Sequence, residues 1–160
     1  MAARAWNKPV WASGRGQIGF YLNDVYNGDA HSTIRVSVGG KSSAGSGPIS
    51  VINPGFGWLI PGVGSALQLQ VSKGDSSALT TVTSSFTPVA KQIFDWKMHS
   101  DGAGNVTLWI NDDVVATTAN GPTTSTPESY NFYFEMVEQT ASTATRVVWE
   151  SMNSRLWWGV

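Results

Sequence analysis

Acid–base chemistry in this chain of 160 residues would have to come from a few carboxylates placed in strand-like stretches. A glycosidase needs two carboxyl groups that flank one bond, roughly 5–10 Å apart according to mechanism. Glu135 and Glu138 are three residues apart, so on a regular strand they point to opposite faces. A small glycoside hydrolase is therefore only the third hypothesis, and its candidate acids are Asp95, Glu135, Glu138 and Glu150.

The two histidines, His31 and His99, form no recognisable Ser-His-Asp arrangement, and their spacing does not fit a zinc site. A Gly-x-Gly-x-x-Gly pattern at residues 14–19 is followed by a strand pattern. A dinucleotide site of this kind needs a helix there, so we reject it. The sequence thus predicts no catalytic residues and no enzyme.

Aspartates in the expected loops are the only candidate metal ligands. Oxygen-rich loops can bind calcium, but turn chemistry explains the same residues without a metal. We therefore expect no cofactor, with calcium kept as the alternative. The aspartates concerned are Asp24, Asp29, Asp101, Asp112 and Asp113.

Composition excludes several classes of partner. The formal net charge is -1, so nothing steers the chain to nucleic acid or to an anionic membrane. No stretch is apolar for long enough to span a bilayer. Cysteine is absent, which excludes disulfides and thiolate metal sites. Eight tryptophans are many for this length, and they hint at a large ligand or partner.

Alternating apolar and polar residues predict β-strands through most of the chain. The clearest stretch runs from Ile93 to Thr118 and reads as three antiparallel strands joined by two turns. Its first strand places Phe94, Trp96 and Met98 on one face. No window has useful helical periodicity, and short strands with Gly, Pro and Asn turns recur every 8–12 residues or so.

This pattern predicts an all-β protein, an antiparallel two-sheet β-sandwich. We interpret residues 1–160 as a single domain. Residues 1–16 are predicted to form an N-terminal arm or edge strand, because Pro9 cannot donate to a central ladder. The expected last strands are residues 143–150 and 155–160.

The stretch Trp96 … Asp101-Gly-Ala-Gly-Asn-Val-Thr-Leu-Trp-Ile-Asn111 … Val115-Ala116 resembles the concanavalin A-like, laminin-G-like jelly rolls. It differs at Asn111-Asp112, where Asn-Gly is usual in that family. The resemblance implies two antiparallel sheets. It also implies a choice among lectins, glycan-binding modules, glycoside hydrolases and small domains of phage particles, because fold alone does not decide function.

Aromatic residues are the candidate binding residues. Trp109 points away from its strand neighbours Leu108 and Ile110, so it is either exposed or covered. The aromatic residues near the two ends of the chain could close a sheet or dock on another subunit. The full set of candidates is Trp109, Trp58, Tyr133, Trp6, Trp11, Trp157 and Trp158.

From these features we expect a non-enzymatic structural protein of a virion, made in the host cytoplasm, that decorates a capsid or belongs to a tail. Its aromatic patches would bind neighbouring protein subunits, and a homo-oligomer, with a trimer favoured, would form. The alternative is a carbohydrate-binding module in which Trp109, Trp58 or Tyr133 stacks against a glycan.

Overall fold

The computed structural model describes residues 5–20, 32–39, 53–61, 65–89, 92–125, 131–138 and 147–158. Ten strands lie in these ranges, and all of their pairings are antiparallel. One sheet has the order β10-β1-β6-β7-β8 and the other has the order β5-β4-β3-β2-β9. The predicted antiparallel β-sandwich is therefore confirmed.

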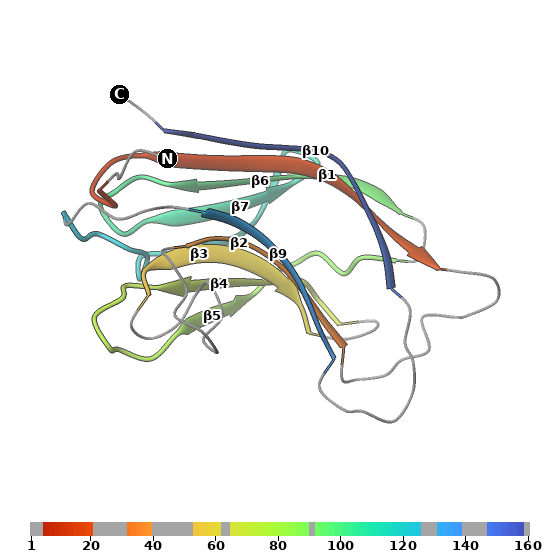
Figure 1. Cartoon of the computed structure of the whole chain (residues 1–160), viewed down its shortest axis with the longest axis horizontal. Coiled ribbons are helices and arrows are strands. Elements are labelled where there is room, and N and C mark those ends of the chain that lie inside the picture. Colours follow the sequence, from red (N-terminus) through yellow and green to blue (C-terminus); the bar gives the residue numbers. More distant parts are fainter. Residues whose placement is uncertain are drawn as a thin grey trace.

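The first sheet consists of β10 (Val147–Trp158), β1 (Val10–Phe20), β6 (Ile93–Ser100), β7 (Val106–Ile110) and β8 (Asp113–Thr118). The second consists of β5 (Thr80–Thr83), β4 (Gln68–Ser72), β3 (Gly55–Ile60), β2 (Ser32–Gly39) and β9 (Asn131–Glu138). Figure 1 shows the two sheets as stacked layers. In this view β3 and β9 arch toward the first sheet, so the outer side of the second sheet lies on the inside of the curve.

The core lies between the layers and follows the alternation of the strands. In β6 the buried residues Phe94, Trp96 and Met98 alternate with residues that are exposed or partly exposed. The same period of two places Leu108 and Ile110 in the core from β7. The other sheet contributes large side chains as well, and the ring of Trp58 meets that of Trp96 edge-on, with centroids 6.0 Å apart.

The amino-terminal segment is not the predicted arm. Strand β1 begins at Val10 and pairs with both β10 and β6, so residues 10–16 lie inside a sheet. Pro9 directly precedes the first paired residue, so its missing N–H removes no hydrogen bond between the strands. The register shift between Arg15 and Gly16 marks a β-bulge.

The end of the chain also differs from the prediction. One strand, β10, replaces the two expected strands at residues 143–150 and 155–160. The bulge explains this, because an extra residue lets one long strand keep pairing with β1 although its alternation changes phase. In such a strand the alternation of apolar and polar residues is interrupted at the bulge, although the strand continues through it.

The β7–β8 turn accommodates the departure from Asn-Gly noted above. Asn111 and Asp112 both have positive φ, 51° and 69°. Asn and Asp tolerate this left-handed region better than other residues with side chains. The turn thus forms with Asp112 at a position that glycine would occupy with less strain.

Candidate functional site

Each sheet has a face that points away from the core, and the two outer faces differ in chemistry. In the second sheet, Val36, Phe56 and Leu69 belong to the core cluster, so their neighbours along each strand point outward. We call this outer surface the polar face. Its residues on the four strands from β2 to β5 are Arg35, Ser37, Gly57, Leu59, Gln68, Gln70, Ser72, Thr81 and Thr83.

Cross-strand register arranges the polar face in rows. Ser37 pairs with Gly57, Gly57 with Gln70, and Gln70 with Thr81. On the other side of Ser37, Tyr133 of β9 occupies the next register position. Exposure rises along this row, from Ser37 at 0% and Gln70 at 9% to the exposed Thr81 at the sheet edge. The row is therefore open to solvent at its β5 end.

Two oxygens in this row have unsatisfied hydrogen-bonding capacity. Ser37 Oγ and Gln70 Oε1 are buried and have no hydrogen-bond partner within the described part of the chain. Leaving a buried polar group unpaired costs about 1–3 kcal/mol. A ligand that brought hydroxyl groups to these two oxygens would recover that cost.

The middle of the row has no side chain. A Cβ on Gly57 would come within 2.5 Å of both Ser37 Cβ and the Val36 carbonyl oxygen. Only glycine therefore fits where β2 and β3 approach each other, and Gly57 is itself buried.

The outer surface of the first sheet carries stacked rings, and we call it the aromatic face. Trp11 of β1 stacks on His99 of β6, with ring centroids 3.9 Å apart and an angle of 22° between the planes. Trp11 is also nearly parallel to Trp109 of β7, at 5.9 Å and 23°. The amine of Lys97 lies 5.1 Å from the centroid of the Trp109 ring, within the range of a cation–π contact.

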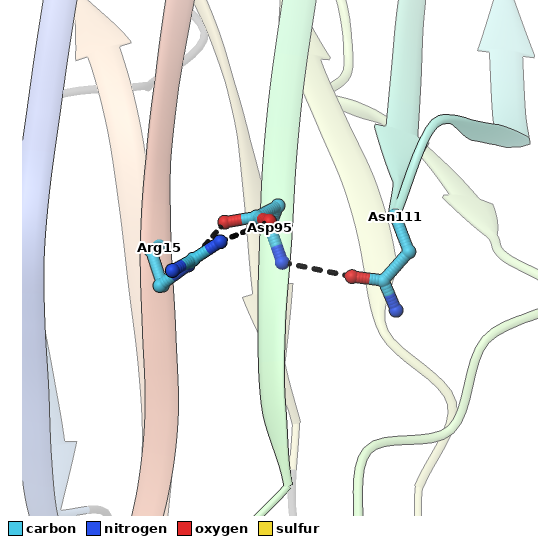
Figure 2. Close-up of polar contacts among 3 residues, drawn as sticks. All are labelled: Arg15, Asp95 and Asn111. Carbon is cyan, nitrogen blue, oxygen red and sulfur yellow. Dashed lines mark hydrogen bonds and ion pairs between the residues drawn. The ribbon is translucent and has the colours of Figure 1, made fainter.

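The first sheet also carries an ion pair between β1 and β6 (Figure 2). Arg15 donates two hydrogen bonds to the Asp95 carboxylate, from Nε at 2.6 Å and from Nη2 at 2.7 Å. The backbone N–H of Asp95 donates to the side-chain oxygen of Asn111 at 2.9 Å. The hydrogen bonds from Arg15 lower the pKa of Asp95, so this carboxyl is a poor general acid.

His99 is the one histidine in the described ranges, and it is partly buried under Trp11. Burial lowers the pKa of its imidazole, while the Asp101 carboxylate opposes this shift. Because the usual pKa is about 6.5, His99 is neutral at pH 7. The stack is thus an uncharged aromatic group at neutral pH.

The predicted acids divide between the two sheets. Asp95 in β6 and Glu150 in β10 lie in the first sheet, whereas Glu135 and Glu138 lie in β9 of the second. Within the described ranges, no group of three or more His, Asp or Glu side chains could hold a metal ion. Asp24 and Asp29 lie outside these ranges, so the calcium alternative remains a prediction for them. None of the described residues forms a helix that could cross a bilayer.

Two of the predicted aromatic binding residues belong to the core. Trp6 and Trp58 both have 0% exposure, and Trp6 packs edge-on against Phe56 with centroids 5.8 Å apart. Neither ring can contact a ligand, which corrects the sequence-based expectation for both. Trp58 lies on the side of β3 that faces the other sheet, and alternation alone does not say which side that is.

The remaining candidates lie in β1, β7, β9 and β10. The structure brings Trp11 and Trp109 together on the aromatic face, although they come from opposite halves of the chain. Trp157 occupies the register position opposite Trp11, and Trp158 the one opposite Val10. Tyr133 occupies the position next to Ser37.

Sequence reasoning did not select the polar face, although a signal for it was present. The alternation in Leu67-Gln-Leu-Gln-Val71 places Gln68 and Gln70 on one side of a strand. The alternation around Arg35 and Ser37 does the same in β2. What the sequence could not show is that these strands flank β3, so that their polar sides form one surface.

By sequence, the chain matches no protein-family model and no curated protein. By structure, it is similar to an alginate lyase from Pseudomonas aeruginosa, with a TM-score of 0.64 and 10% identity over 98% of this chain and 68% of that one. A family 7 alginate lyase in complex with a substrate gives 0.61 and 14%, over 98% and 63%. Sheep galectin-11 in complex with glycerol gives 0.52 and 12%, over 93% and 90%.

These similarities correct the functional prediction. The expectation of a non-enzymatic virion structural protein is wrong, because the solved structures that the chain resembles include alginate lyases and a galectin. The prediction that the chain is not an enzyme conflicts with the same comparison, since alginate lyases are enzymes. The chain spans about two thirds of the length of these two lyases. At these identities the likeness establishes the fold, and the chain is a concanavalin A-like jelly-roll sandwich.

Proposed function

We propose that the chain recognises a polysaccharide on its polar face. The observation that carries this proposal is the pair of buried, unpartnered oxygens, Ser37 Oγ and Gln70 Oε1, in one cross-strand row. Sugar hydroxyls can donate to both oxygens, whereas an apolar ligand would leave them unpaired. Gly57 between them adds no side chain to the row, and Thr81 at the β5 end of the row is exposed to solvent.

The structural neighbours suggest the class of sugar. The alginate lyases among the structural neighbours support the choice of an acidic polysaccharide.

Binding is tested by affinity electrophoresis in gels that contain alginate, with Ser37→Ala as the main variant. Ser37 Oγ has no protein partner in the described structure, so its removal should leave the free energy of unfolding unchanged or raise it. If sugar hydroxyls use this oxygen, the same variant should bind alginate several-fold more weakly, because one hydrogen bond contributes about 1 kcal/mol.

Ser100→Ala is the matched control. Ser100 Oγ is also buried without a partner in the described structure, but it faces the core from β6. This variant should change neither alginate binding nor the mobility of the protein in a plain gel. Equal alginate binding by the Ser37 and Ser100 variants, or no retardation of the unmodified protein, would overturn the proposal.

A second candidate function is cleavage of the bound polysaccharide by β-elimination. In this reaction a base removes the proton beside the uronate carboxylate, a C=C bond forms, the C–O bond to the leaving sugar breaks, and the departing oxygen takes up a proton. Tyr133, next to Ser37 in register, is of a type that can transfer protons. Growth of ultraviolet absorbance from the unsaturated product, lost in Tyr133→Phe, tests this candidate. A chain that binds alginate without producing that absorbance is a binding module.

A further inference from the structure

We propose that the aromatic face is a second carbohydrate site, specific for a neutral, β-linked glycan. This inference goes beyond the proposed function, because it concerns the opposite sheet and another class of sugar. Its centre is the group formed by Trp11, His99 and Trp109, which come from three adjacent strands. The ring centroids of Trp11 and Trp109 are 5.9 Å apart, so the rings form one compact group.

The rings are fixed before any ligand arrives. Trp11 is held against His99 at 3.9 Å, and Trp109 is held near-parallel to Trp11 and beside Lys97. Preorganised side chains lose little conformational entropy on binding. The electron-rich ring faces attract the positively polarised C–H groups of a pyranose, and β-linked hexoses present such C–H groups along a flat chain. All three side chains are only partly buried.

The polar groups around the rings favour a neutral ligand. Arg15 forms an ion pair with Asp95, and Lys97 lies 3.7 Å from the Asp112 carboxylate. The described cations of this face are thus matched by acids, and no charge is left for a uronate to neutralise. Paired charges at the surface still have free donor and acceptor positions for hydroxyl groups.

The charged residues on the aromatic face also argue against a second copy of the chain binding there. The centres of protein–protein interfaces are depleted of charged residues. Here Lys97 lies beside the Trp109 ring, and both members of the Arg15–Asp95 pair on the same sheet are about half exposed, at 48% and 56%. Burying them under a protein would remove their water without supplying new partners.

Affinity electrophoresis in hydroxyethyl cellulose, a neutral β-linked glucan, tests the proposal. The unmodified chain should be retarded. Trp11→Ala and Trp109→Ala should each weaken the binding by about fivefold or more, which is the equivalent of one aromatic contact. Trp109→Tyr keeps an aromatic ring and should retain most of the binding, which separates lost stacking from lost folding.

The polar-face variant distinguishes the two sites. Ser37→Ala should weaken retardation by alginate and not retardation by hydroxyethyl cellulose, while the two Trp→Ala variants should do the reverse. The proposal is overturned if the unmodified chain passes the glucan gel freely, if both Trp→Ala variants bind normally, or if Ser37→Ala abolishes glucan binding. It is also overturned if sedimentation velocity shows a dimer that Trp109→Ala dissociates, because a second copy would then occupy this face.

Discussion

Arg15 and Asp95 join two strands whose residues are 80 positions apart in the sequence. Both side-chain hydrogen bonds of the pair are short, and the backbone of Asp95 is held in addition by the side chain of Asn111. The pair lies across the β1–β6 ladder, where Arg15 and Asp95 are register partners. A long-range contact between neighbouring strands therefore fixes the polar border of the aromatic face.

Asp95→Asn should lower the free energy of unfolding at pH 7 by a small amount, because both partners are about half exposed and water screens their attraction. Arg15 lowers the pKa of Asp95 in the folded chain, so this stabilisation is complete above the unfolded pKa of about 4. It is lost as the pH falls through the folded pKa. Urea titrations should therefore show the difference between the two proteins shrinking as the pH falls below about 4.

Asp113→Asn serves as the control for this experiment, because Asp113 is exposed at the start of β8 and forms no ion pair with the described residues. It should not reproduce the stability difference of Asp95→Asn at pH 7. A stability difference for Asp95→Asn that does not shrink in acid would show that Arg15 is not the cause.

Acidification from pH 7 should destabilise the chain through His99. Burial lowers the folded pKa of this imidazole, so the unfolded chain takes up its proton first, near pH 6.5. Stability then falls with decreasing pH until the folded pKa is reached. His99→Phe keeps an aromatic ring beside Trp11 and should lack this step in thermal melts between pH 7 and 5.

The chain has one other histidine, so His31→Gln isolates the signal of His99 in a proton NMR titration. The remaining imidazole should titrate below about 6.5. A midpoint above that value would mean that the attraction of Asp101 outweighs burial, and would reverse the expected effect on stability.

Asp112→Gly should raise the free energy of unfolding by up to about 1 kcal/mol, because φ at this residue is 69° and glycine adopts such values without strain. The loss of the 3.7 Å contact with Lys97 should matter little, since the Asp112 side chain is 97% exposed. Asp113→Gly is the matched control. It places glycine within strand β8 and should destabilise by about 0.5–1 kcal/mol. Equal effects of the two substitutions in urea titrations would contradict this account of the turn.

Gly57→Ala should destabilise the chain by about 1–3 kcal/mol, because its Cβ would overlap Ser37 Cβ and the Val36 carbonyl oxygen. Adding Ser37→Gly removes only the first of these contacts. The double variant should therefore recover part of the loss in a double-mutant cycle. Additive effects of the two changes would show that Ser37 and Gly57 are not in close contact.

Local alternation was sufficient for most of the strands and for part of the core. Phe94, Trp96 and Met98 were predicted to be buried together, and they are, because successive residues of any strand face opposite sides whatever lies around it. The β6–β7–β8 meander was also predicted from its turn residues. None of these local features concerns the assembly of the protein, so the predicted trimer stays a prediction.

Which strands lie next to each other depends on contacts between distant residues, and only the tertiary structure decided that. It placed β1 between β10 and β6, made Trp58 a core residue, and brought Trp11 to Trp109. It also aligned Ser37, Gly57 and Gln70 in one row. The sequence by itself determined that each strand has an apolar and a polar side, because that period is a local property of the backbone. The two candidate faces arise only when sheet pairing sets those sides next to one another.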